Sequence, residues 1–83
     1  MKELARTPKQ IGTTIQRARK KREWTQAQLA QRAGLRQGTI SLIETGEKLA
    51  KLDSILAVLA ALDLEFTIGA RIKGTASDIE ELF

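Results

Sequence analysis

The 83-residue sequence contains no cysteine and no histidine, and this double absence argues against whole classes of function. Without cysteine no disulfide can staple the fold, and only carboxylates remain among the usual ligands of zinc. The carboxylates themselves are scattered, so no acid–base or nucleophile constellation is visible. An enzyme is therefore the weakest interpretation, and we expect neither a metal nor a cofactor.

Long apolar runs are also missing from the sequence. No segment is long enough to span a bilayer, and the start, MKELARTPKQ, lacks the apolar stretch of a signal peptide. The length allows one domain with one modest core, so further stability must come from tight helix packing or from a second chain. These features predict a soluble, cytoplasmic protein.

Charge is distributed unevenly along the chain. Residues 1–51 hold twelve Lys or Arg against four Asp or Glu, a balance of +8, whereas residues 52–83 have a balance of −4. A basic region of this kind indicates binding to a polyanion, usually nucleic acid. An ordinary solvated lysine-rich helix face would give the same pattern, so charge alone does not decide the function.

Two helix starts are marked by capping boxes. Thr7-Pro8-Lys9-Gln10 predicts a helix to about Arg22, with Thr7 as N-cap and Pro8 at the first position. Thr25-Gln26-Ala27-Gln28 predicts a second, short helix that ends at Gly34. Trp24 precedes this second start and is interpreted as a hydrophobic staple and core plug rather than as a base-stacking ring.

Two more helices follow, and then an extended segment. A third helix is predicted from Arg36 or Gln37 to Thr45, and Gly46 ends it. A fourth helix carries an apolar stripe and ends near Asp63. The stripe comprises Leu52, Ile55, Leu56, Leu59 and Leu62. Residues 64–68 then alternate strictly, with Leu64, Phe66 and Ile68 on one face of a predicted strand. A lone strand needs a partner, and the same strand of a second copy would supply it across a two-fold axis. A frayed segment or a longer fourth helix would also fit.

The two ends of the chain have no clear period. We expect a flexible N-terminus over residues 1–6 and a flexible tail over residues 69–83. The tail alternates acidic and apolar residues near its end, a pattern that fits either a docking segment ordered on binding or plain terminal disorder.

The second and third helices are joined by a glycine turn at Gly34-Leu35. Two short helices with such a turn are typical of a helix-turn-helix, whose second helix lies in the major groove of DNA. The predicted third helix suits this role because Leu35, Ile40 and Ile43 form an apolar side. Its other side is small and polar and comprises Gln37, Gly38, Thr39 and Ser41.

The stretch WTQAQLAQRAGLRQGTISLIETG resembles the helix-turn-helix of the Xre/Cro repressor family. The resemblance covers roughly residues 11–62 and includes the helix starts, the core positions and the turn together. It implies an all-α, λ-repressor-like bundle of four or five helices over residues 7–68. The C-terminal strand, residues 64–68, would pair in a homodimer.

The resemblance also implies roles for individual residues. Gln26 is similar to the family glutamine that binds phosphate and braces the next helix. Gln37 is similar to the family glutamine that reads a base, and a glutamine side chain can form a bidentate bond to adenine. Arg36 would reach guanine or phosphate, and Ser41 a base edge. Thr39 and Lys48 would meet backbone phosphate, although an ordinary helix surface would also explain Thr39 and Ser41.

Four further positions qualify that picture. Arg19 and Glu44 match the positions of a family pair that links the first helix to the end of the third, and the resemblance therefore implies a structural ion pair; an arginine fork suits a carboxylate. Gly38 and Leu42 depart from the polar residues of some relatives. Gly38 only permits a close approach, and Leu42 either touches a thymine methyl or belongs to the core.

The flanking segments narrow the resemblance. The Thr-Pro start, the stretch RKKREWTQ and the segment LEFTI are similar to the HipB-type antitoxins of type II toxin–antitoxin systems. This implies a dimer that binds operator DNA, represses its own operon and neutralises a HipA-like serine/threonine kinase toxin. A stand-alone Xre-type repressor is the main alternative, and a protein-interaction module that no longer binds DNA is a third.

Overall fold

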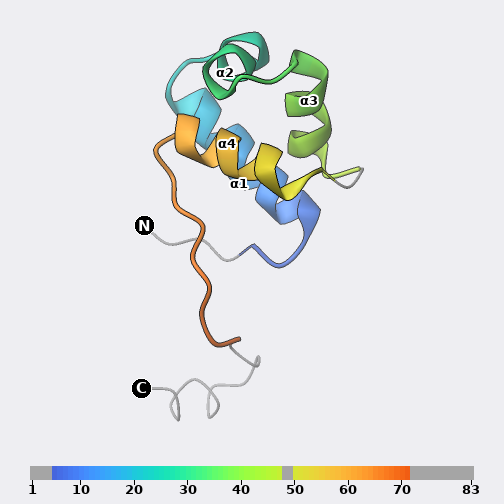
Figure 1. Ribbon diagram of the computed structural model, residues 1–83, viewed down its shortest axis with the longest axis vertical. Helices are drawn as coiled ribbons and strands as arrows, with labels where there is room; N and C mark the ends of the chain where they lie inside the picture. The colour runs from blue at the N-terminus through green and yellow to red at the C-terminus, as the bar shows by residue number, and fades with distance from the viewer. Residues whose placement is uncertain (1–4, 48–49, 72–83) are drawn as a thin grey trace.

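The computed structural model describes residues 5–47 and 50–71 and contains four helices in this part of the chain (Figure 1). They are α1 (Pro8–Lys21), α2 (Gln26–Ala33), α3 (Gln37–Thr45) and α4 (Leu52–Ala61). The four helices gather into one bundle, which confirms the predicted all-α architecture. None of the described helices is long and apolar enough to cross a membrane.

The starts of α1 and α2 are fixed by the two capping boxes that the sequence predicted. The amide of Gln10 donates to Thr7 Oγ1 over 3.1 Å, and Gln10 Oε1 accepts from the amide of Thr7 over 3.1 Å. Thr25 and Gln28 exchange the same two bonds over 3.1 Å and 2.8 Å. Each box satisfies backbone donors that the first helical turn otherwise leaves open.

Each of the four helices is followed by a residue with left-handed backbone conformation. Gly34 and Gly46 were predicted to end α2 and α3, and their φ angles are +72° and +68°. Glu23 and Asp63 adopt φ +59° and +57° after α1 and α4 although they carry side chains. After three of these four residues, the next residue donates its amide back to the preceding helix and packs against the core. These next residues are Trp24, Leu35 and Leu64; Gly46 is the exception. The chain therefore turns back onto the core at these three ends.

The core takes at least one fully buried side chain from every helix. Ile15, Leu29, Ile40 and Val58 are completely buried, as is Leu62, which directly follows α4. The predicted stripe on α4 is partly wrong, because Leu52 and Leu56 are 61% and 44% exposed. The helix is apolar on almost every side, so the period alone does not tell which side faces inward.

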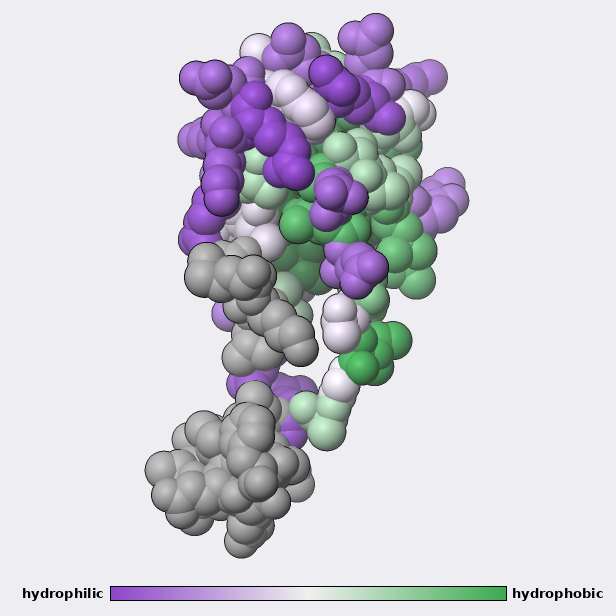
Figure 2. All heavy atoms as spheres, turned by 90° about the vertical axis from the view of Figure 1, so that its left-hand side faces the viewer, coloured by the Kyte–Doolittle hydropathy of each residue, from purple (hydrophilic) through white to green (hydrophobic). Residues whose placement is uncertain are grey.

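Residues 64–71 leave α4 as an extended chain that runs away from the bundle (Figure 1). The fourth helix ends at Ala61, so a longer helix is excluded. Leu64 packs against the core, whereas Phe66 and Ile68 are 52% and 87% exposed. Figure 2 shows the side of the molecule from which this segment leaves the bundle, with hydrophilic side chains above and apolar side chains gathered below and to the right. A strand is defined by hydrogen bonds to a neighbour, so the dimer strand stays a prediction in this single chain.

Candidate nucleic-acid interface

Helices α2 and α3 form the predicted helix-turn-helix. The connection is short, from Gly34 to Arg36, and the amide of Leu35 donates to the carbonyl of Ala30 over 2.9 Å. This bond closes the turn, and the buried side chains of Leu29 and Ile40 hold the two helices to the same core. Helix α3 is thereby presented at the surface of the bundle as a firmly supported element.

The start of α3 is the most open part of that helix. Arg36 and Gln37 are exposed, as is Gly38, and Arg36 makes no capping hydrogen bond with its side chain. The first turn of a helix carries unsatisfied amides and the positive end of the helix dipole, so this end attracts anions. Polar, exposed residues at the start of such a helix are suited to base edges and phosphates.

The remaining residues of α3 divide between the two sides of the helix. Thr39 and Ser41 are half-buried, while Ile40 and Ile43 face the core. Leu42 is 42% exposed, so of its two predicted roles the structure excludes membership of the core. The sequence-predicted contact residue Lys48 lies outside the described residues.

A buried ion pair joins α1 to the end of α3. Arg19 Nε donates to Glu44 Oε2 over 2.7 Å, and Arg19 Nη2 donates to Glu44 Oε1 over 3.0 Å. The side chains are only 10% and 2% exposed. Arg19 Nη1 also donates to the carbonyl of Trp24 over 2.7 Å. A bidentate pair with a third bond is directional, so it fixes both the distance and the rotation of α3 relative to α1.

Gln26 adds a third member to this pair. Its Nε2 donates to Glu44 Oε1 over 3.2 Å from the first residue of α2. We call Arg19, Gln26 and Glu44 the bracing network, because one carboxylate at the end of α3 holds together three helices. Gln26 is half-buried, so this residue is not fully enclosed by the bracing network.

Two arginines that sequence reasoning left in the general basic surface have defined structural partners. The guanidinium of Arg32 lies 4.2 Å from the centroid of the Trp24 ring, and that of Arg22 lies 5.7 Å from it. Arg22 Nη2 also donates to the carbonyl of Leu62 over 2.6 Å. The sequence held one usable signal, because a tryptophan at a staple position that is only half-buried leaves part of its ring face open to a long cation.

Close contact between α1 and α3 depends on a residue that sequence reasoning also missed. Gly12 is buried in α1, and a Cβ atom there would lie 2.5 Å from the carbonyl oxygen of Glu44 and even closer to that of Ile43. The backbones can approach this closely only because position 12 has no side chain. Gly12 therefore sets how deeply α3 sits against α1.

Comparisons with known proteins agree with this geometry. Residues 15–68 match the family model described as helix-turn-helix. The chain is 31% identical over 62 residues to the antitoxin HipB of Escherichia coli K12, and this match covers 75% of this chain and 70% of that protein. HipB of E. coli O6:H1 strain CFT073 is likewise 31% identical over 62 residues, covering 75% of this chain and 66% of its own length. The chain thus spans about two thirds of the length of these relatives.

Solved structures are similar as well. A HipB chain, solved as a variant in complex with an O2 20mer, has a TM-score of 0.77 and 28% identity, covering 84% of this chain and 97% of that chain. A chain of "Structure of HipA-HipB-O2-O3 complex" has a TM-score of 0.74 and 27% identity with the same coverage.

Proposed function

The chain belongs to the helix-turn-helix family and, within it, to the HipB-type regulators, and from this premise we propose that it is a dimeric, operator-binding antitoxin. In this proposal it represses its own operon from the cytoplasm and neutralises a HipA-like serine/threonine kinase toxin. Membership of this family makes the chain a regulator rather than an enzyme. One similar structure is described as a HipA-HipB-O2-O3 complex, which supports both kinds of partner.

The observation that carries DNA binding is the open first turn of α3 on a rigid support. Arg36 and Gln37 are exposed there, while the bracing network holds the other end of the helix. We propose that Gln37 reads an adenine and that Arg36 contacts guanine or phosphate. Ser41 would reach a base edge. Phosphate contacts are assigned to Gln26, Thr39 and Lys48.

Dimerisation is supported by the apolar side chains that one copy leaves exposed. Phe66 and Ile68 alternate with polar residues on an extended segment, which is the pattern of a strand that buries one face. Pairing this segment with its twin would cover those side chains and relate two α3 helices by a two-fold axis. The operator half-sites should then lie about 34 Å apart, one helical turn of DNA.

Replacing Gln37 by alanine tests the base-reading role. We expect about a tenfold loss of affinity for the promoter DNA and a much smaller loss for random DNA, because a base contact discriminates while a phosphate contact does not. Fluorescence anisotropy at fixed salt measures both affinities. Gln31→Ala is the matched control, since Gln31 is an exposed glutamine of α2 to which we assign no contact. Equal losses on both DNAs would remove Gln37 from base reading.

Co-purification tests the antitoxin role. The tagged chain is expressed together with the gene adjacent to its own, and the eluate is run on a sizing column with and without promoter DNA. We expect a kinase-like partner to elute with the chain and the complex to shift with DNA. A bare dimer that still shifts with DNA would instead identify a stand-alone repressor, and a chain that shifts with no promoter fragment would overturn DNA binding itself.

A further inference from the structure

Two arginines at the C-terminal end of α1 form hydrogen bonds to two different helices. Arg19 binds Glu44 at the end of α3, and Arg22, one turn later, binds the carbonyl of Leu62 at the end of α4. Among the described residues, extensive packing joins α1 to α3 and α2 to both α3 and α4. The pair of α1 and α4 is not among these, although Ile15 and Val58 share the core, and the bond from Arg22 ties the ends of these two helices directly.

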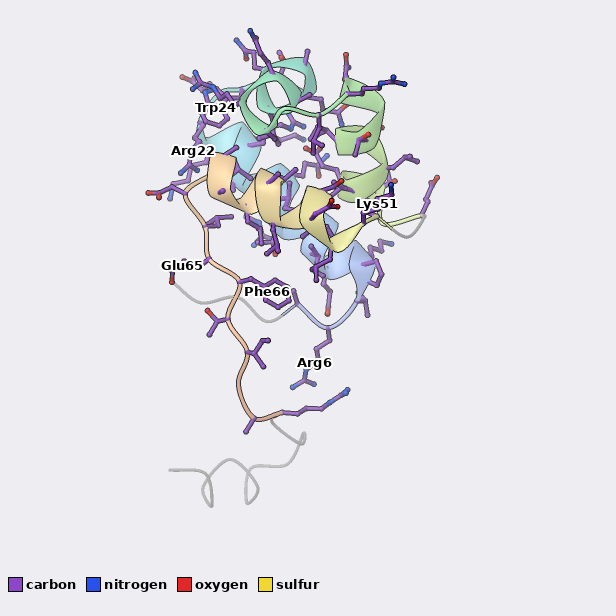
Figure 3. All side chains as sticks on the ribbon, in the orientation of Figure 1. Arg6, Arg22, Trp24, Lys51, Glu65 and Phe66 are labelled. Atoms are coloured by element: carbon purple, nitrogen blue, oxygen red, sulfur yellow. The ribbon has the colours of Figure 1, made fainter. Side chains whose placement is uncertain are left out.

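The carbonyl that Arg22 holds stands where the chain changes direction. Leu62 is followed by Asp63 with φ +57°, and the amides of Asp63 and Leu64 donate back to Ala60 and Leu59 over 3.0 Å and 2.8 Å. The peptide between Leu62 and Asp63 therefore determines where the extended segment starts and in which direction it leaves the bundle. Figure 3 shows Arg22 beside Trp24 at this exit, with Phe66 further along the departing segment.

The side chain of Arg22 is itself held in position. The guanidinium of Arg22 lies over the Trp24 ring, 5.7 Å from its centroid, and that of Arg32 lies over the same ring at 4.2 Å from the centroid. The carbonyl of Trp24 in turn accepts from Arg19 over 2.7 Å. A connected set of contacts thus runs from the bracing network at α3, through Trp24 and Arg22, to the start of the segment proposed to join two copies.

We propose that Arg22 is a positioning residue that fixes the direction of the dimer segment relative to α3 and thereby sets which half-site spacing the dimer prefers. The inference rests on the proposed function, because spacing matters only to a dimer that reads two half-sites. It concerns geometry rather than contact with DNA. Moving one half-site by a base pair rotates it by about 34–36°, so a rigid dimer rejects the change while a loosely joined dimer tolerates it.

Operators with altered spacing test this directly. Affinity is measured for the native spacing and for operators with one or two base pairs inserted or removed between the half-sites. We expect the wild-type chain to prefer the native spacing by about tenfold or more and Arg22→Met to reduce that preference to about threefold or less. Lys21→Met is the control, since it removes a neighbouring exposed cation and should leave the preference unchanged. An Arg22→Met variant that binds every operator more weakly with its preference intact would overturn the proposal.

A measurement without DNA separates this inference from the proposed function. The chain has no cysteine, so Gln31→Cys places one spin label per copy on exposed α2, and the distance between labels is measured in the dimer. We expect one narrow distance between the labels in the parent and a broadened or shifted distance in the Arg22→Met variant. If the Arg22→Met variant fails to fold, the Arg22→Lys variant is measured in its place. An unchanged distribution or a monomeric parent overturns the inference. A narrow, Arg22-dependent distance in a chain that ignores all DNA would overturn the proposed function and the role in half-site spacing, but not the positioning of the dimer segment by Arg22.

Discussion

Replacing Glu44 by alanine is expected to lower the free energy of unfolding by about 3–5 kcal/mol, the usual cost of removing one partner of a buried ion pair. Among the described residues, the change leaves the guanidinium of Arg19 buried with the carbonyl of Trp24 as its one remaining partner, and it removes the acceptor of Gln26. A domain of this size has a total stability of roughly 4–12 kcal/mol, so the variant should lose a large part of its stability.

Urea unfolding followed by circular dichroism measures this loss. Glu47→Ala is the matched control, because Glu47 is an exposed glutamate three residues later and its loss should change stability by less than about 0.5 kcal/mol. The double variant Arg19→Met/Glu44→Leu should recover much of the stability, since it removes both charges rather than leaving one behind. A loss below about 1 kcal/mol for Glu44→Ala would mean that the pair contributes little to holding α3.

The helices were predictable because their ends carry local chemistry. Thr7 and Thr25 each begin a capping box, and these boxes depend only on residues within four positions of each other. Gly34 signals its left-handed conformation by its identity alone. Glu23 adopts the same conformation with a side chain, so the end of α1 gave no such signal, and only the apolar Trp24 behind it indicates that the chain turns inward.

Tertiary features were predictable only where residue chemistry is selective. Arg19 and Glu44 were paired through family resemblance, because no pattern along the sequence connects residues 25 positions apart. The buried side of α4 was predicted only in part, since Val58 and Leu56 are both apolar and the packing of the other helices distinguishes them. Arg22 reads as one more surface cation until the end of α4 is seen beside it.

Replacing Gly12 by alanine is expected to lower the free energy of unfolding by about 3 kcal/mol, at the upper end of the cost of overfilling a packed interior. Helix propensity alone predicts the opposite sign, because alanine stabilises a helix interior by about 1 kcal/mol relative to glycine. The steric effect should dominate, since the new methyl group would lie 2.5 Å from the carbonyl oxygen of Glu44 and its obstacle is backbone rather than a movable side chain.

Gly38→Ala supplies the same chemical change in open space. A Cβ atom at Gly38 has no neighbour within 4 Å, so this variant should be as stable as the parent or up to about 1 kcal/mol more stable. Both variants are compared by urea unfolding, and opposite signs are the expected result. If Gly12→Ala were as stable as Gly38→Ala, α3 could withdraw from α1 at little cost. The missing side chain at Gly12 would then not be what sets the depth of α3.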